Sequence, residues 1–437
     1  MVYVQNIHGV PLMPTERYGK VRRLLRDKKA EVINRTPFTI RLIYETAEDN
    51  KEFLTLGVDA GSKTIGLSVT SEKKEYFRSE VALRTDIVEL LSDRRERRKA
   101  RRGRKTRYRK PRFENRVRTK RNGWLAPSIR EKIGTHLSVV DGVMKILPVS
   151  KIVVETASFD TQMLRAIEQG DPLPHGKDYQ RGEQLNFWNV REYVLFRDGH
   201  VCQCCLGKSK DRVLNVHHIE SRKTGGNSPT NLITLCETCH DAYHKGKIEL
   251  PERVKRGKKY NDAAFMGIMR WAFYNRLNEI YPEIAVCVTF GYITKNTRIT
   301  NGLPKEHSID ARCITGNPNA EPSEEIFLQK KVRCHNRKLF KSTIGKGGKK
   351  KRNQVPKYLF GYQLFDRVRM PDGREGFVFA RRRSGSFDIR TISGEKLSAG
   401  ISYRKLKPLE KRKTILIERK RVDSSARLKP SVSAEMK

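Results

Sequence analysis

Four of the eight cysteines in this 437-residue chain form two Cys-x-x-Cys motifs. The first consists of Cys202 and Cys205, and the second of Cys236 and Cys239. Four thiolates at this spacing can complete the tetrahedral shell of a zinc ion, which then holds the local fold together. The sequence therefore predicts a structural Zn²⁺ site and leaves Cys204 as the spare cysteine of the first motif.

Histidines lie between and just after these motifs. His217 and His218 are adjacent, Asn231 follows, and His240 and His244 come after the second motif. Because the cysteines already satisfy zinc, these residues are free for other chemistry. Imidazole can deprotonate water near pH 7, and a divalent cation can stabilise the charge that develops during phosphodiester hydrolysis. A zinc finger that only binds DNA needs neither the paired histidines nor the asparagine.

Three carboxylates form a second candidate set. Asp59 and Glu155 each follow an apolar strand pattern, and Asp310 lies in an expected helix start, three residues after His307. Residues so far apart in sequence can converge if their strands share one sheet. In so basic a chain, a convergent acidic cluster is costly unless cations fill it.

Asp59 by itself is compatible with several structures. It fits a plain hairpin, the first phosphate loop of a sugar-kinase or actin-like ATPase, or the metal-binding strand of a ribonuclease H-like nuclease. The ATPase interpretation is weaker because the sequence contains no second phosphate loop and no adenosine-site glycines.

The elements that must position these residues follow from hydrophobic periodicity. Alternation predicts two strands joined by a turn within residues 54–69, and a buried strand over 150–156. Period-3.6 patterns predict helices over 133–147 and 262–279. A strand over 285–292 and a helix start at 306–314 complete the pattern.

The chain carries a formal net charge of +42, from 91 Lys and Arg against 49 Asp and Glu. Such an excess indicates a polyanionic partner, most simply nucleic acid, with an anionic membrane as the alternative. No run approaches 18 apolar residues and no signal peptide is visible, so we expect a cytoplasmic protein that is associated with nucleic acid and not with a membrane.

Residues 86–121 are the most biased segment, with seventeen Lys and Arg against two acids from Arg94 onward. The absence of Gly and Pro up to Arg102 predicts a helix that is cationic on every face. Nucleic-acid phosphates would neutralise such a helix, whereas solvent exposure alone leaves like charges one turn apart. The candidate phosphate-binding residues are Arg94, Arg95, Arg97, Arg98, Arg101, Arg102 and Arg104, and Tyr108 is a candidate for stacking on a base.

These motifs resemble those of two nuclease families. The ordered set Val216-His217-His218-Ile219, Gly225-Gly226-Asn227, Asn231-Leu232 and Cys239-His240 resembles an HNH nuclease of the ββα-metal fold. This resemblance implies that His218 is the general base, that His217 and His240 hold one Mg²⁺, and that Asn231 fixes the loop carrying His218. His244 is a weaker metal candidate.

The split set of Asp59, Glu155 and Asp310 resembles the RuvC-type nucleases, which have a ribonuclease H-like fold. The resemblance implies that these three residues hold two Mg²⁺ ions and that His307 acts as a base or ligand. With Pro11-Leu12-Met13-Pro14 at the front, the order of all these parts resembles the IscB family. IscB proteins are transposon-encoded RNA-guided DNA endonucleases, related to the type II CRISPR effector.

The IscB resemblance implies a multidomain α/β protein with a RuvC core split in three. The expected parts are an N-terminal domain (1–52), RuvC part I (53–85), an Arg-rich bridge helix (86–122), RuvC part II (123–165), a linker (166–184), an HNH zinc module (185–250), RuvC part III (251–330) and a basic C-terminal β domain (331–437). Four short strands within 365–409 suit a small SH3-like barrel, and residues beyond about 418 are expected to be disordered.

The same resemblance implies the partners. A structured guide RNA (ωRNA) binds one protein monomer and pairs with double-stranded DNA beside a short motif that the C-terminal domain reads. The HNH module then cuts the RNA-paired strand, and the RuvC core cuts the displaced strand. The alternatives are an unguided structure-specific or homing nuclease and an RNA- or DNA-binding protein with idle sites.

Overall fold

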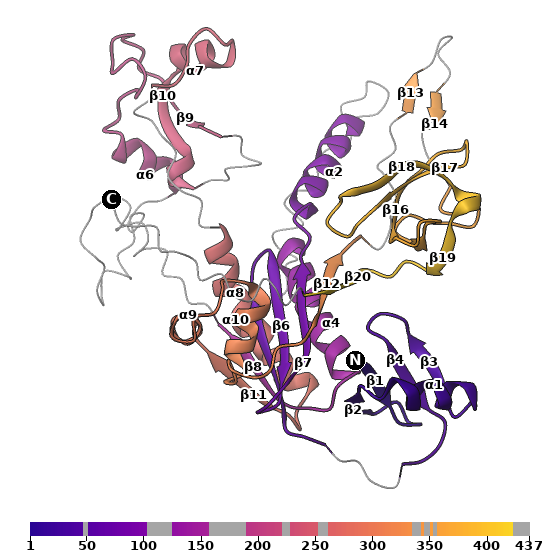
Figure 1. Ribbon diagram of the computed structural model, residues 1–437. Coiled ribbons are helices and arrows are strands. Elements are labelled where there is room, and N and C mark those ends of the chain that lie inside the picture. Colours follow the sequence, from indigo (N-terminus) through magenta and orange to yellow (C-terminus); the bar gives the residue numbers. More distant parts are fainter. Residues whose placement is uncertain are drawn as a thin grey trace. The chain divides into compact units, whose positions relative to one another are not determined.

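The computed structural model describes residues 1–46, 51–102, 125–156, 189–220, 228–251, 261–333, 342–344, 350–352 and 356–422. The chain forms two compact units (Figure 1). The larger unit comprises Met1–Ser158 and Phe265–Lys437, and the inserted unit comprises Phe159–Ala264.

A seven-stranded sheet forms the centre of the larger unit. In spatial order its strands are β11 (Ala285–Thr289), β8 (Val149–Glu155), β5 (Leu54–Ala60), β6 (Thr64–Thr70), β7 (Glu75–Ala82), β12 (Glu325–Lys331) and β20 (Ile415–Arg421). Strands β5, β6 and β7 are antiparallel neighbours, whereas β8 and β11 run parallel to β5. The carboxyl ends of β5, β8 and β11 therefore meet at one edge of the sheet.

The two faces of β5 have different partners because side chains alternate along a strand. Leu56 and Val58 point into the main apolar core, to which helices α4 (Pro127–Met144) and α8 (Asn261–Ile280) also contribute. Gly57 and Asp59 point to the opposite face, where α10 (His307–Ile314) lies. The predicted strands and helices around these residues are confirmed.

Two segments differ from their predicted structure. The strand expected over residues 285–292 ends at Thr289, and helix α9 (Gly291–Thr300) begins two residues later. At the other end of the chain, β20 continues past Glu418 to Arg421 and pairs with β12 in the central sheet. The prediction of disorder beyond residue 418 was wrong because the charged residues at the end of this edge strand gave no hydrophobic pattern that indicates a strand. Residues 423–437 lie outside the described part.

The N-terminal segment forms its own four-stranded sheet, in the order β2-β1-β4-β3. Its elements are β1 (Val2–Gln5), β2 (Pro11–Thr15), α1 (Tyr18–Arg26), β3 (Ala30–Asn34) and β4 (Thr39–Leu42). The two prolines of Pro11–Pro14 lie on an edge strand, where a missing N–H group costs no ladder bond.

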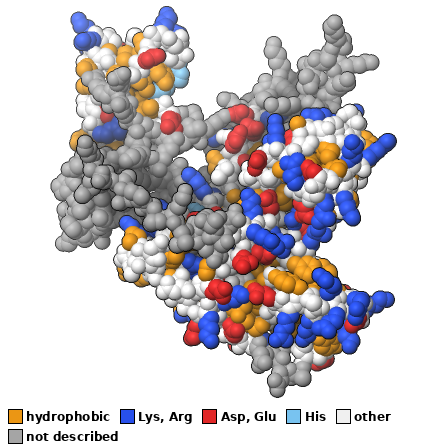
Figure 2. Space-filling view, in the orientation of Figure 1, with side chains coloured by type: hydrophobic (Ala, Val, Ile, Leu, Met, Phe, Trp, Pro, Cys, Tyr) orange, Lys and Arg blue, Asp and Glu red, His pale blue; other side chains and the backbone are white. Residues whose placement is uncertain are grey.

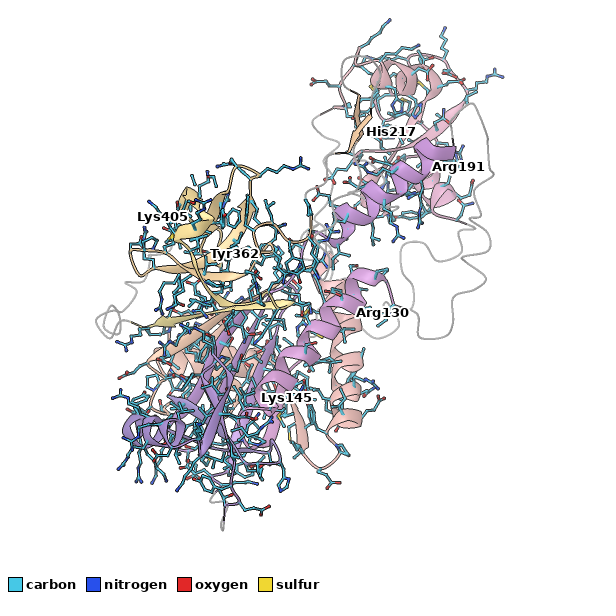
Figure 3. All side chains as sticks on the ribbon, turned by 90° about the vertical axis from the view of Figure 1, so that its right-hand side faces the viewer. Arg130, Lys145, Arg191, His217, Tyr362 and Lys405 are labelled. Carbon is cyan, nitrogen blue, oxygen red and sulfur yellow. The ribbon has the colours of Figure 1, made fainter. Side chains whose placement is uncertain are left out.

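Five antiparallel strands follow towards the C-terminus, in the order β18-β17-β16-β15-β19. They are β15 (Arg367–Arg369), β16 (Glu375–Arg381), β17 (Ser386–Arg390), β18 (Lys396–Ser402) and β19 (Lys407–Glu410), close to the predicted positions. Tyr362, labelled in Figure 3, donates its hydroxyl proton to the Leu406 carbonyl beneath this sheet. A hairpin of β13 (Ser342–Ile344) and β14 (Lys350–Arg352) precedes it.

The predicted Arg-rich helix is α2 (Ile87–Arg102). Most of its described side chains are exposed, and Lys and Arg side chains are abundant over the visible described surface (Figure 2). Arg104, Tyr108, the linker at 166–184 and the Gly225–Asn227 segment lie outside the described residues. No helix in the described ranges is long and apolar enough to cross a membrane.

The inserted unit contains α6 (Val190–Arg197), β9 (Leu214–His218), the single turn η2 (Pro229–Asn231), β10 (Leu232–Cys236) and α7 (Glu237–His244). Strands β9 and β10 are antiparallel, with Ile233 opposite His217 and Leu232 opposite His218. Helix α7 starts directly after β10, so the second Cys-x-x-Cys motif spans the junction between strand and helix.

Replacing Gly57 with alanine should destabilise the larger unit, because the added Cβ would clash with the Ala311 carbonyl oxygen of α10. Overpacking of this kind costs about 1–3 kcal/mol. The free energy of unfolding in urea measures the effect. Gly134→Ala is the matched control: a Cβ added at Gly134 in α4 would meet no atom within 4 Å outside the backbone of its own helix turn, so alanine should stabilise the helix by up to about 1 kcal/mol. Equal stability of the Gly57→Ala and wild-type proteins would contradict the packing of α10 on β5.

Candidate active sites

Asp59 and His307 are in direct contact. The Asp59 carboxylate points to the α10 face of the sheet, and its Oδ2 lies 2.6 Å from His307 Nδ1. The Asp59 side chain is 14% exposed and the His307 side chain 49% exposed, so the pair lies at the mouth of the site. The hydrogen bond to Asp59 is the main cause that raises the pKa of His307.

Glu155 ends β8, the neighbour of β5, at the same edge of the sheet. Burial, together with the nearby charges of Asp59 and Asp310, raises its pKa from 4.5 to about 7. The Thr294 hydroxyl is close enough to lower this pKa, but its geometry falls short of a hydrogen bond. The carboxylates of both strands and of α10 thus influence one another electrostatically.

Asp310 is the third carboxylate of this edge. Its Oδ1 lies 2.9 Å from Arg298 Nε of α9, in an ion pair that is not aligned as a hydrogen bond. Burial and the Asp59 charge raise the pKa of Asp310, against the opposing charges of Arg298 and His307. A buried carboxylate oxygen without a hydrogen bond is a suitable ligand for a hard cation such as Mg²⁺. The residues present therefore fit a divalent cation.

Two β7 residues that the sequence analysis missed hold the start of α10. Arg78 donates through Nε to Ser308 Oγ at 3.1 Å and through Nη2 to Glu306 at 2.6 Å. Glu80 accepts the Ser308 backbone N–H at 3.2 Å. Charged residues at alternate positions of a strand ordinarily indicate a solvent-exposed face. The sequence pattern of β7 therefore did not predict that Arg78 and Glu80 contact the start of α10.

Three histidines of the inserted unit form a compact group. The ligand atoms of His217, His240 and His244 all lie within 4.8 Å of one another. His217 comes from β9, and the other two lie one turn apart on α7, where their Nε2 atoms are 3.3 Å apart. His244, the weaker candidate from sequence, belongs to this group. Figure 3 labels His217 in the inserted unit.

The state of His217 suits a metal ligand. Its Nε2 is buried and has no hydrogen-bond partner. Burial, together with the adjacent His240, His244 and His218, lowers the pKa of His217 to about 4, so the ring is neutral at pH 7. Imidazole donors favour Zn²⁺, Ni²⁺ or Cu²⁺ over Mg²⁺. The three imidazoles thus fit a divalent ion, but they suit Zn²⁺, Ni²⁺ or Cu²⁺ better than the predicted Mg²⁺.

His218 lies apart from this group, because adjacent residues of β9 point to opposite faces. The chain after His218 is fixed by Asn231, whose side chain is fully buried. Asn231 accepts the Glu220 N–H at 2.9 Å and donates to the Glu220 carbonyl at 3.0 Å, while its own carbonyl accepts the Ile219 N–H. The role of Asn231 in fixing the loop that carries His218 stays a prediction.

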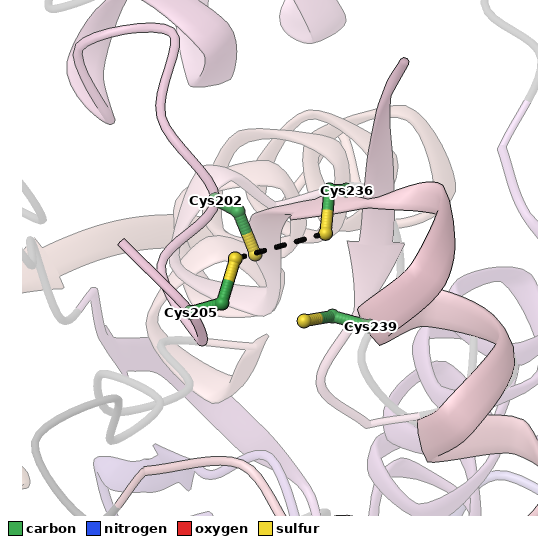
Figure 4. A group of neighbouring side chains, drawn as sticks. All are labelled: Cys202, Cys205, Cys236 and Cys239. Carbon is green, nitrogen blue, oxygen red and sulfur yellow. Dashed lines mark hydrogen bonds between the residues drawn. The ribbon is translucent and has the colours of Figure 1, made fainter. Parts of the chain in front are cut away.

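The four predicted zinc ligands form the second compact group (Figure 4). Cys205 Sγ lies 3.8 Å from Cys236 Sγ, which matches the edge of about 3.8 Å expected for a tetrahedron with Zn–S bonds of about 2.3 Å. A hydrogen bond with Ser209 is the main cause that lowers the pKa of Cys205 to about 6, whereas burial is the main cause that raises the pKa values of Cys202 and Cys239 in the metal-free cluster. Cys204 is not a member of the group.

Within the described ranges, the carboxylates do not form a third group as compact as these two. A wider spacing is compatible with a site for two cations about 4 Å apart, because each ion then needs its own ligands.

Two family models match the chain. A model described as RRXRR protein matches residues 2–182, and a model described as HNH endonuclease matches residues 202–246. The second range includes the cysteine cluster and the three grouped histidines. The chain therefore carries an HNH endonuclease domain, which implies nuclease activity and a divalent metal ion.

Parts of the chain are similar to solved Cas9 structures. Streptococcus thermophilus Cas9, in complex with the AGAA PAM, has 13% identity and a TM-score of 0.33 over 52% of this chain and 32% of that chain. The Type II-C Cas9 enzyme from Actinomyces naeslundii has 17% identity and a TM-score of 0.17 over 46% and 33%. This chain thus spans about a third of either Cas9, and such TM-scores are too low to assign a fold. No curated protein matches the chain.

Loss of one zinc ligand should unfold the inserted unit and leave the larger unit folded. Cys239→Ser removes a thiolate from the cluster, and structural zinc contributes on the order of 10 kcal/mol in small zinc peptides. Limited proteolysis and zinc content measure the effect. Cys204→Ser is the matched control and should keep both the metal and the protection from protease. Retained zinc in Cys239→Ser, or unfolding of both units together, would count against this cluster.

Binding of Mg²⁺ to the carboxylate site should strengthen as the pH rises from 6 to 8. The pKa of Glu155 in the folded protein, about 7, lies above its ordinary value of 4.5, so the metal-free fold loses stability between these values as the carboxyl ionises. A cation offsets that loss and no longer competes with a proton at pH 8. The Mg²⁺-induced rise in melting temperature should therefore be larger at pH 8 than at pH 6.

Glu155→Gln should remove this pH dependence, whereas Glu283→Gln, which changes an exposed carboxylate, should preserve it. A Mg²⁺ effect of the same size at both pH values in the wild-type protein would show that Glu155 does not contribute to the site.

Proposed function

We propose that this protein is an RNA-guided DNA endonuclease with two active sites. The observation that carries the proposal is the presence of two different phosphodiesterase-type residue sets in one chain. One set is built from imidazoles in the inserted HNH unit, and the other from carboxylates at one edge of the central sheet. The simplest explanation for two such sites in one chain is that each site cuts one of the two DNA strands.

In the HNH unit, His218 takes the proton from the attacking water. Its position is held by the hydrogen bonds between Asn231 and the backbone of Glu220. His217 and His240, joined by His244, would hold a divalent ion, which would stabilise the charge that develops on the phosphate oxygens. The neutral state of His217 favours this role, because a protonated ring cannot bind a metal.

We assign the central sheet to the ribonuclease H-like fold and its edge to a RuvC-type site. Three antiparallel strands are followed by two parallel ones, which brings Asp59 and Glu155 to the same edge. Asp59, Glu155 and Asp310 would hold two Mg²⁺ ions, which stabilise the attacking and leaving oxygens. His307 keeps its proton to a higher pH through its bond to Asp59, so it is better suited to donate a proton to the leaving oxygen than to bind an ion.

Helix α2 is the proposed contact with the guide RNA. Between Arg94 and Arg102 its sequence carries six arginines and one lysine against one acidic residue, Glu96, and a charge of +42 on the chain requires a polyanion of comparable extent. The C-terminal five-stranded sheet, which we assign to an SH3-like barrel, is the proposed reader of the flanking DNA motif. One protein with one structured RNA is the proposed assembly.

The RNA that co-purifies with the protein tests the guided function. A discrete species of a few hundred nucleotides, recovered at one copy per protein, is the expected result. Cleavage of DNA matching a segment of that RNA, and not of unmatched DNA, completes the test. DNA cleavage by RNA-free protein would instead favour an unguided nuclease.

Single substitutions should separate the two sites. His218→Ala should leave only the displaced strand cut, and Asp59→Ala should leave only the RNA-paired strand cut, because the two residue sets belong to different folding units. A supercoiled plasmid with each strand labelled separately gives the measurement, with Glu283→Gln as a control that linearises it. If either alanine variant still linearises the plasmid, or if both cut the same strand, the division of labour is wrong.

A further inference from the structure

Two aromatic side chains lie exposed beside the carboxylate site. Phe290 is 47% exposed and Tyr292 is 67% exposed, although both are large apolar rings. Their planes differ by only 10° and their centroids are 6.1 Å apart. Rings held parallel at a surface leave faces on which a further planar group can stack.

The strand register places this pair at the edge that carries the carboxylates. Thr289, the last residue of β11, is the register partner of Glu155 on β8, and Phe290 is the next residue. Between the two rings, Gly291 approaches Glu155 so closely that an added Cβ would lie 3.0 Å from Glu155 Oε1. The aromatic pair therefore flanks the point at which the backbone meets Glu155.

The helix that follows the pair offers contacts to phosphates. Helix α9 contains Lys295 and Arg298 and no acidic residue, and Lys295 is exposed on the same side as Tyr292 and Ile299. Aromatic rings together with cations are the combination with which proteins bind single-stranded nucleic acid without sequence preference. A duplex keeps its bases stacked on one another and has no free face to offer these rings.

We propose that Phe290 and Tyr292 form a base-stacking platform for single-stranded DNA, which directs the strand into the carboxylate site. The proposal rests on the nuclease function proposed for that site. Each ring stacks on one base, and Lys295 neutralises the adjoining backbone. The phosphate that follows the stacked bases then lies at the edge occupied by Asp59, Glu155 and Asp310.

Photocrosslinking tests the platform directly. A single-stranded oligonucleotide containing 5-iodouracil is bound to the full-length protein, as purified with its RNA, in Ca²⁺, and the crosslinked peptide is mapped by mass spectrometry. Crosslinks should map to Phe290 or Tyr292, and the same oligonucleotide in a duplex should give none there. The double variant Phe290→Leu/Tyr292→Leu, which keeps apolar volume but removes the aromatic faces, should lose them.

Strand-resolved cleavage provides the second measurement. The double leucine variant should cut the displaced strand at least about tenfold more slowly, because removing a ring that stacks on a base weakens binding by roughly that factor. It should cut the paired strand at the wild-type rate. The swapped variant Phe290→Tyr/Tyr292→Phe, which keeps two aromatic rings, should retain both crosslinking and cleavage.

Phe53→Ala is the matched control. Phe53 is about as exposed as Tyr292 but precedes β5, whereas Asp59 lies near the other end of that strand, about 20 Å away at 3.3 Å per residue. Its substitution should change neither measurement.

The outcomes separate this proposal from the proposed function. Wild-type crosslinks at other residues, or unchanged cleavage by the leucine variant, would overturn the platform while leaving the nuclease intact. Crosslinks at Phe290 or Tyr292 in a protein that cuts neither strand would support the platform and overturn the nuclease function. Equal slowing of both strands, with a lowered melting temperature, would show that the rings only stabilise the fold.

Discussion

The close approach of α10 to the central sheet is the constraint on which the carboxylate site depends. A Cβ at Gly57 would clash with the Ala311 carbonyl oxygen, and one at Gly66 would clash with that of His307. Only glycine lets two backbones come this near. Because Gly66 is the register partner of Asp59, this approach also sets Asp59 against His307. The positions of Asp59 and His307 thus depend on Gly57 and Gly66, which have no side chains.

Repulsion among partly buried carboxylates explains why this edge of the sheet would favour bound cations. Burial, together with the charges of the other carboxylates, raises the pKa of Glu155 to about 7. Two protein cations offset part of the repulsion, since His307 bonds Asp59 and Arg298 pairs with Asp310. Both contacts involve oxygens that a metal would need. A cation at this edge would add to these internal partners and relieve the remaining repulsion among the carboxylates.

Local patterns predicted the elements that carry the site, but not the contacts between them. Alternation along β5 and helical spacing after His307 are properties of adjacent residues, and the two Cys-x-x-Cys motifs indicate their ligand directly. The support of α10 by Arg78 depends on pairing across some 230 residues, which periodicity does not contain. The start of α9 at Gly291 was missed because its β-branched and aromatic sequence favours a strand.

The two candidate metal groups of the inserted unit share one short helix, α7. Cys236 and Cys239 hold the start of α7 in the cysteine cluster, and His240 follows Cys239 directly. A zinc ion there would fix the first turn of α7 and, through it, the direction of His240 and His244 towards His217. Zinc would thus position imidazoles that do not bind it, whereas the carboxylate edge is positioned by the close packing of α10 on the sheet and by the contacts of Arg78 and Glu80 with the start of α10. Each site can therefore fail without the other.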